Sequence, residues 1–216
     1  MLDLGAGTGK LTATLVALGA EVIAVEPDPA MLTELRHGLP EVRALGGRAE
    51  ALPLADASVD AVLAGNALHW FDMEVAGPEI ARVLVPGGIL AGLWNVMDDR
   101  VDWVAELERV SGPVAIGPRD TFRRWRAATA DAYLPATGFI THFGGPEQAE
   151  FPHGQIRTAD SLVATIATRA GILVMPAEER EVVLDRIRAF LAIRPETSYG
   201  EFMLPMLTGV LRLRRL

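Results

Sequence analysis

A glycine-rich segment near the start of the chain constrains its fold more than any other feature. Glycines stand at positions 5, 7 and 9, directly after the apolar stretch Leu2–Leu4 and before Lys10–Leu18, where apolar residues recur at helical spacing. Glycine has no Cβ, so the backbone can turn sharply and approach a ligand closely. A helix N-terminus adds unpaired N–H groups and a positive dipole end. The segment predicts a strand, a ligand-binding turn and a helix, with a purely structural turn as the alternative.

The spacing of these glycines separates the known kinds of nucleotide loop. A dinucleotide fingerprint, G-x-G-x-x-G, needs a glycine at position 10, where this chain has Lys10. The phosphate-cradling G-x-x-x-x-G-K-[ST] loop is absent as well. An NAD-type oxidoreductase is therefore disfavoured. Glu26 follows Gly5 by 21 residues, at the end of the next predicted strand. A carboxylate there can accept hydrogen bonds from both hydroxyls of a ribose.

Short apolar runs alternate with helical patterns up to about residue 95, which is typical of a parallel sheet covered by helices. The expected strands are residues 2–4, 21–25, 42–45, 59–64 and 89–94, and the expected helices are 10–18, 29–37 (with Asp28 as N-cap) and 73–84. Beyond residue 100 we expect helices at 101–110, 122–133, 159–170 and 177–191. A turn-interrupted strand at 138–152 and a last strand at 201–213 complete the pattern.

Composition excludes several classes of protein. The chain has no cysteine, which rules out disulfides, thiolate metal sites and a cysteine nucleophile. Its formal net charge of −8 argues against a nucleic-acid partner. The N-terminus lacks the pattern of a signal peptide, and no apolar run approaches the roughly 20 residues of a membrane span, so we expect a cytoplasmic protein without membrane insertion. His37, His142 and His153 show no paired ligand spacing, and no metal site is expected.

Five segments together resemble class I S-adenosylmethionine-dependent methyltransferases of the small-molecule type. Leu2–Lys10 resembles their glycine-rich first motif, and Val25–Asp28 resembles their acidic second-strand motif. Ala49–Leu54 is similar to the segment that lines the adenine, and Glu79–Gly88 matches the helix and turn before their fifth strand. Ala67–Phe71 is similar to the type 11 subgroup, related to trans-aconitate and ubiquinone/menaquinone methyltransferases.

The resemblance implies an α/β, Rossmann-like class I methyltransferase fold, with a mostly parallel seven-strand-type sheet and helices on both faces. A single domain over residues 1–216 would comprise a cofactor-binding half (1–95), a helical acceptor-side insertion (100–137) and C-terminal strands and helices (138–216). About one or two helices usually precede the first strand in such proteins, so the N-terminal helices are expected to be missing. Either the full protein starts upstream, or the chain is a truncated form with weakened cofactor binding.

By the same resemblance, S-adenosylmethionine is the cofactor and S-adenosylhomocysteine its product. Gly5, Gly7 and Gly9 would pass beneath the methionine part of the cofactor, with Asp3 near the amino group. Glu26 would hold the ribose hydroxyls.

The adenine would be held by a second group of residues. Pro27 and Met31 would flank the ring, while the backbone at Ala49, with Glu50 beside it, would read the edge of the base. Relatives often carry an acidic residue where this chain has Arg48. The contact to the adenine amino group would therefore depend on the backbone.

The loop after the fourth expected strand carries the best-placed polar groups for chemistry, because open α/β sheets bind ligands at the carboxyl ends of their strands. His69 could deprotonate a hydroxyl or bind a carboxylate, or it could simply line the pocket or pack. Asn66 could contact the cofactor pocket or cap the loop. Trp70, Phe71 and Trp94 could shape an apolar pocket for the methyl acceptor or belong to the core.

One basic cluster, Arg119, Arg123, Arg124 and Arg126, could clamp an acidic substrate or form a solvated helix face. We expect methyl transfer from S-adenosylmethionine to a small-molecule acceptor, with O-methylation favoured. The alternatives are C-methylation of a quinone-like or lipid acceptor, a non-catalytic S-adenosylmethionine-binding or truncated inactive homologue, and the disfavoured oxidoreductase. The sequence predicts no oligomeric state.

Overall fold

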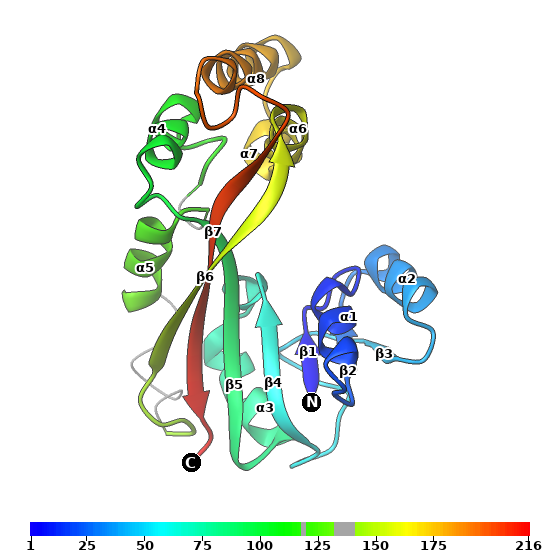
Figure 1. The fold of residues 1–216 in the computed structure, drawn as a ribbon. Coiled ribbons are helices and arrows are strands. Elements are labelled where there is room, and N and C mark those ends of the chain that lie inside the picture. Colours follow the sequence, from blue (N-terminus) through cyan, green and yellow to red (C-terminus); the bar gives the residue numbers. More distant parts are fainter. Residues whose placement is uncertain (118–119, 132–140) are drawn as a thin grey trace. The chain divides into compact units, whose positions relative to one another are not determined.

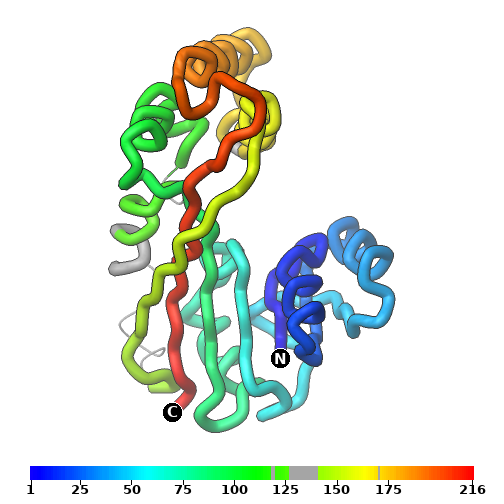
Figure 2. Tube along the Cα trace, viewed as in Figure 1, coloured from blue at the N-terminus to red at the C-terminus, as the bar shows by residue number. Residues whose placement is uncertain are grey.

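The computed structural model describes residues 1–117, 120–131 and 141–216 of the chain (Figures 1 and 2). The expectations for Arg119 and for residues 132–140 lie outside these ranges. The elements follow one another in the order β1 (Leu2–Leu4), α1 (Lys10–Ala17), β2 (Ile23–Glu26), α2 (Pro29–Gly38), β3 (Arg43–Gly46), β4 (Val59–Gly65), η1 (Leu68–Trp70), α3 (Met73–Val83), β5 (Leu84–Met97), α4 (Asp102–Ser111), α5 (Phe122–Asp131), β6 (Glu147–Thr158), α6 (Ala159–Ala167), α7 (Ala170–Leu173), α8 (Ala177–Ala192) and β7 (Glu201–Arg214).

The strands form one seven-stranded sheet in the order β3-β2-β1-β4-β5-β7-β6. The pairs β2–β3, β1–β2, β1–β4 and β4–β5 are all parallel, which confirms the expected α/β class and mostly parallel sheet. The arrows of β6 and β7 point in opposite directions (Figure 1). Since β1 has β2 on one side and β4 on the other, the strand order reverses there. Such a switch point is where open α/β sheets bind ligands, beyond the carboxyl ends of the strands.

Local chemistry sets the boundaries of the early helices. Asp28 caps α2 by accepting hydrogen bonds from the N–H groups of Ala30 (2.8 Å) and Met31 (3.0 Å), and Pro29 occupies the first helical position. The predicted cap is thereby confirmed. The N-cap position of α1 is held by Gly9 in a left-handed conformation, and no side chain caps that helix. The first turn of α1 therefore keeps N–H groups available for a ligand.

Three elements differ from the sequence-based expectation. Strand β5 is longer than 89–94 because it begins directly after α3, before Gly87, and continues to Met97. The predicted helix 159–170 ends at Ala167, and α7 is a separate short helix. Strand β6 begins at Glu147 and continues through Pro152 to Thr158, beyond the expected end at residue 152. Because β6 is the last strand of the sheet, the N–H that proline lacks can fall on its unpaired side.

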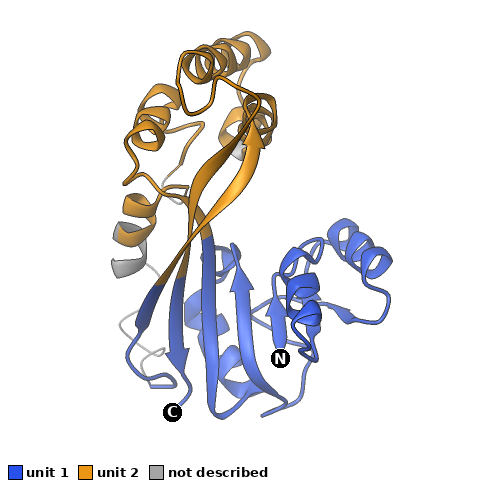
Figure 3. Ribbon diagram, in the orientation of Figure 1, with its two compact units in different colours: residues 1–94, 131–149, 210–216 blue, residues 95–130, 150–209 orange. Residues whose placement is uncertain are grey.

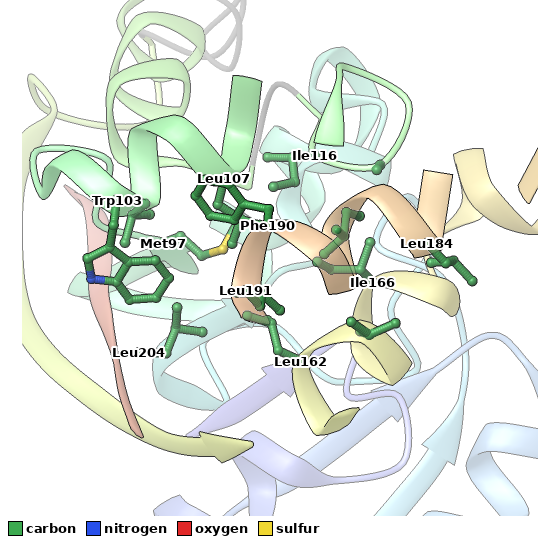
Figure 4. Close-up of a cluster of buried hydrophobic side chains, with 14 of the residues drawn as sticks. Met97, Trp103, Leu107, Ile116, Leu162, Ile166, Leu184, Phe190, Leu191 and Leu204 are labelled. Atoms are coloured by element: carbon green, nitrogen blue, oxygen red, sulfur yellow. The ribbon is translucent and has the colours of Figure 1, made fainter. Parts of the chain in front are cut away.

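The chain divides into two compact units, drawn in separate colours in Figure 3: residues 1–94, 131–149 and 210–216, and residues 95–130 and 150–209. The single-domain organisation stays a prediction. The second unit has its own apolar core, in which side chains of α4, α6 and α8 pack together with Met97 and with β7 (Figure 4). Trp103 meets Phe202 edge-on, with ring centroids 5.9 Å apart. Among the described residues, no helix is long and apolar enough to cross a membrane.

Candidate functional site: the glycine loop and its neighbours

The loop between β1 and α1 uses all three predicted glycines in the left-handed region of backbone space. The φ angles are +69° at Gly5, +58° at Gly7 and +88° at Gly9, values that other residues adopt only with strain. The N–H groups of Gly5 and Ala6 both donate to the carbonyl of Val25, at 2.9 and 3.1 Å, which holds the loop against the end of β2. The glycine loop is therefore a tight turn bonded to the end of β2.

The glycine loop also touches the loop that follows β4. A Cβ added at Gly5 would lie 2.7 Å from the Cβ of Ala67 and 3.6 Å from the ring of Phe71. The β1–β4 register, with Asp3 opposite Leu63, brings the carboxyl ends of these strands together. Gly5 is thus required twice, by its φ angle and by the close approach of a second loop.

Asp3, the middle residue of β1, is a buried carboxylate whose two oxygens differ in their contacts. Its side chain is only 1% exposed, and Oδ2 accepts a 2.6 Å hydrogen bond from the hydroxyl of Thr12 on α1. Oδ1 is buried and has no hydrogen-bond partner among the described residues. Burial raises the pKa of Asp3 from 3.8 to about 6, although the hydrogen bonds from Thr12 oppose the rise. A cation placed against Oδ1 would satisfy this oxygen and favour its charge.

Glu26, the last residue of β2, points back to the glycine loop. Its Oε2 accepts a 2.8 Å hydrogen bond from the N–H of Gly7, and its Oε1 accepts a 2.9 Å hydrogen bond from the N–H of Asp28. The residue is buried. Each carboxylate oxygen can accept a second hydrogen bond. Glu26 therefore fixes the loop and keeps capacity for hydroxyl donors.

The residues expected around an adenine lie on two further segments. Pro27 and Met31 are exposed, and the Met31 sulfur is 4.0 Å from the position of a Cβ on Gly7. Ala49 is buried. Glu50 accepts a 3.0 Å hydrogen bond from the N–H of Asp72 and lies 3.4 Å from the Arg48 guanidinium.

Desolvation acts to raise the pKa of Glu50, but the hydrogen bond from Asp72 and the nearby guanidinium outweigh it. The net pKa lies below the ordinary value. Glu50 is therefore held as an anion at neutral pH, and it fastens its own loop to the first turn of α3.

The loop after β4 carries the candidate base. Asn66 is exposed at φ +52°, and its N–H donates to the carbonyl of Leu93 at 2.8 Å. His69 lies half-buried in η1, with its ring 5.1 Å from that of Trp70. Trp70 is 76% exposed, whereas Trp94 is 1% exposed. Of the three aromatic candidates, Trp94 is a core residue, and Phe71 is the one beside the glycine loop.

The arginine cluster on α5 is largely engaged in ion pairs within the second unit. Arg124 pairs with Glu108, and Arg126 pairs with Glu150 at 2.5 Å. Arg123 is exposed. The ion pairs favour a structural role for Arg124 and Arg126 over the binding of a substrate carboxylate. Elsewhere in the described ranges, no group of three or more His, Asp or Glu side chains is arranged to hold a metal ion.

Three contributions to the site were not foreseen. Thr12 is a fully buried hydroxyl on α1, and its only sequence signal is a polar residue on the apolar side of the helix. Ala67 lies in the Ala67–Phe71 segment that resembles the type 11 subgroup, but its contact with Gly5 was not foreseen, because the two residues are far apart along the chain. Glu79 and Arg82 on α3 bind the segment after Glu50, and their spacing of three is an ordinary helical ion-pair pattern.

A parallel α/β sheet with a glycine loop and an acidic second strand at its switch point is the arrangement of proteins that bind nucleotide-type cofactors. Comparison with known proteins narrows the class. The model of the methyltransferase domain family matches residues 2–92. An uncharacterized methyltransferase of Mycobacterium tuberculosis is 42% identical over 213 residues, covering 98% of this chain and 82% of that protein. The chain belongs to the methyltransferase family.

Two further similarities are informative. A malonyl-[acyl-carrier protein] O-methyltransferase of Methylococcus capsulatus is 46% identical in an alignment of 97 residues that covers 42% of this chain and 35% of that protein. Among solved structures, a protein described as a type II methyltransferase from Anaeromyxobacter dehalogenans matches with a TM-score of 0.66 at 22% identity, over 99% of this chain and 88% of that one. The fold is the Rossmann-like fold of class I methyltransferases.

Proposed function

We propose that the protein transfers a methyl group from S-adenosylmethionine to a small-molecule acceptor. The observation that carries the proposal is the buried carboxylate of Asp3 beside the glycine loop, whose Oδ1 accepts no hydrogen bond from any described residue. The amino group of an amino-acid ligand is a cation of the right chemistry for that oxygen. Membership of the methyltransferase family points to the same cofactor.

The residues around the loop fit the remaining parts of the cofactor. Gly5, Gly7 and Gly9 offer a surface without side chains to the methionine part, and Glu26 retains lone pairs for ribose hydroxyls. Pro27, Met31 and the backbone at Ala49, with Glu50 and Asn66 nearby, are proposed to surround the adenine side. When bound, S-adenosylmethionine supplies a methyl group on a positively charged sulfur, with a neutral thioether as leaving group.

His69 is the proposed general base. An imidazole nitrogen of His69 accepts the proton of an acceptor hydroxyl while the glycine loop and Phe71 exclude water from that side. This role favours O-methylation, in agreement with the name of the M. capsulatus relative. C-methylation of a quinone-like acceptor is the alternative within the same cofactor chemistry.

Calorimetry with S-adenosylhomocysteine and with NADH tests the cofactor. We expect binding of the former only; binding of NADH without S-adenosylhomocysteine overturns the proposal. A screen over small carboxylic acids, phenols and quinones, with product analysis by mass spectrometry, identifies the acceptor and separates O- from C-methylation.

The role of the base is tested by substitution. His69→Ala is expected to lower kcat by about 10²-fold or more while leaving the affinity for S-adenosylhomocysteine within about twofold of wild type. His37→Ala, which changes an exposed histidine on α2, is the matched control and should leave kcat unchanged. An unchanged kcat in His69→Ala removes the proposed base.

A further inference from the structure

The segment over residues 48–56, here called the adenine-side loop, has almost no regular secondary structure of its own. It is fastened instead to α3 at two places. The first is the start of the helix, where the N–H of Asp72 donates to Glu50 at 3.0 Å. The second is the last turns of the helix, where Glu79 and Arg82 reach into the loop. A loop that lacks the backbone hydrogen bonds of a helix or a sheet depends on such bonds for its position.

The second attachment is a dense set of directed hydrogen bonds. Glu79 accepts a 2.8 Å hydrogen bond from the N–H of Leu52. Arg82 donates to the carbonyls of Leu52 (3.2 Å) and Leu54 (2.9 Å) and to the carboxylate of Asp56 (2.7 Å). It also binds Glu79 bidentately, at 2.7 and 2.8 Å.

These bonds lower the pKa of Glu79, and the same bonds raise the pKa of Arg82. Both shifts favour the charged forms of the two groups. A guanidinium presents five donors in a fixed plane, which lets one side chain bind two carbonyls and two carboxylates at once; the ammonium of lysine has only three donors on a point charge. The arrangement is specific to arginine.

We infer that Glu79 and Arg82 are positioning residues for adenine recognition, acting through the adenine-side loop without contacting the base. The inference rests on the proposed function, in which the backbone at Ala49 reads the base. Adenine offers a donor at its amino group and an acceptor at N1, while hypoxanthine reverses both. A backbone can distinguish the two bases only if its N–H and C=O groups are held in place, and Leu52, three residues after Ala49, is where Glu79 and Arg82 hold it.

The test compares S-adenosylhomocysteine with S-inosylhomocysteine, which differs only in that edge of the base. Titration calorimetry measures both affinities for wild type, Arg82→Gln and Arg82→Lys. Wild type is expected to prefer the adenosyl compound by at least about tenfold, since each neutral hydrogen bond is worth a factor of about 5. In both variants the ratio is expected to fall below about threefold. Arg188→Gln, which removes an exposed helical ion pair with Asp185, is the matched control and should keep the wild-type ratio.

Hydrogen exchange supplies a second readout. Amides of residues 49–56 are expected to exchange at least about tenfold faster in Arg82→Lys than in wild type, with α1 unchanged. If Arg82→Gln does not fold, Arg82→Lys alone decides.

An unchanged ratio or unchanged exchange in the lysine variant overturns the inference, as does a wild type that binds both compounds equally. A wild type that does not bind S-adenosylhomocysteine at all shows a different failure, that of the proposed cofactor itself.

Discussion

Replacing Gly5 by alanine tests the contact between the glycine loop and the loop after β4. The new Cβ would be placed at φ +69°, where L residues are strained. It would also lie 2.7 Å from the Cβ of Ala67, whereas carbon atoms in favourable contact are about 3.5–4.0 Å apart. Both Cβ atoms are bonded directly to the backbone, so neither can move without shifting its loop.

The magnitude follows from the two effects. A left-handed non-glycine residue costs about 1–2 kcal/mol, and inserting a methyl group into a packed place costs about 1–3 kcal/mol more. Gly5→Ala is therefore expected to lower the free energy of unfolding by about 2–5 kcal/mol. Gly19 provides the matched control, because its φ is +84° and a Cβ there meets nothing within 4 Å. Gly19→Ala should cost only the first of the two amounts.

Urea denaturation followed by far-UV circular dichroism measures these differences. The decisive variant is the double substitution Gly5→Ala with Ala67→Gly, which removes the colliding carbon. It is expected to be more stable than the sum of the single changes by about 1–3 kcal/mol. Equal costs at Gly5 and Gly19, together with no recovery in the double variant, would refute the argument that the two loops meet at this point.

Three further predictions concern the cofactor. Gly7→Ala, where the nearest atom to the new Cβ is the Met31 sulfur at 4.0 Å, should cost stability about as Gly19→Ala does but weaken S-adenosylhomocysteine binding at least about tenfold by calorimetry; equal affinity in the two variants contradicts the site. Asp3 has a pKa raised from 3.8 to about 6, so the wild type loses stability as pH rises from 4 to 6. Asp3→Asn, which cannot ionise, should be more stable than wild type by about 3 kcal/mol at pH 7, equal to it below pH 4 in urea titrations, and weaker in cofactor affinity. Glu26→Gln has an amide with a single acceptor oxygen, so it should lose one of the two hydrogen bonds from the backbone. It should destabilise the protein by about 1–2 kcal/mol and weaken cofactor binding. An unchanged melting temperature and an unchanged cofactor affinity contradict the proposal that Glu26 both fixes the loop and binds the cofactor.

The parts of the fold that were predictable are those whose cause is local. The glycines at 5, 7 and 9 predict a sharp turn, and all three adopt positive φ angles that few other residues tolerate. Asp28 followed by Pro29 predicts the start of α2, because the aspartate accepts hydrogen bonds from the first turn and the proline has no N–H to leave unpaired. The alternation of strands and helices then fixes a parallel sheet, since parallel strands need crossover connections.

What the sequence could not provide is the pairing of residues that lie far apart along the chain. Asp3 was expected near an amino group, but nothing local predicts that the Thr12 hydroxyl occupies one oxygen and that no described residue bonds the other. The turn-interrupted strand was expected to end at residue 152, whereas β6 continues to Thr158. Its continuation depends on its place at the end of the sheet order, which periodicity cannot reveal.

The described contacts explain why this site has to be built from several loops at once. Glu26 bonds the end of β2 to Gly7, and Gly5 abuts Ala67 after β4. Glu50 bonds the adenine-side loop to the first turn of α3, the helix that directly follows the loop bearing the candidate base. Each loop is therefore held in place by another loop or by α3. A substitution in one of them should reach the others through a single named contact, which is why the glycine, His69 and Arg82 variants above carry matched controls outside this set of loops.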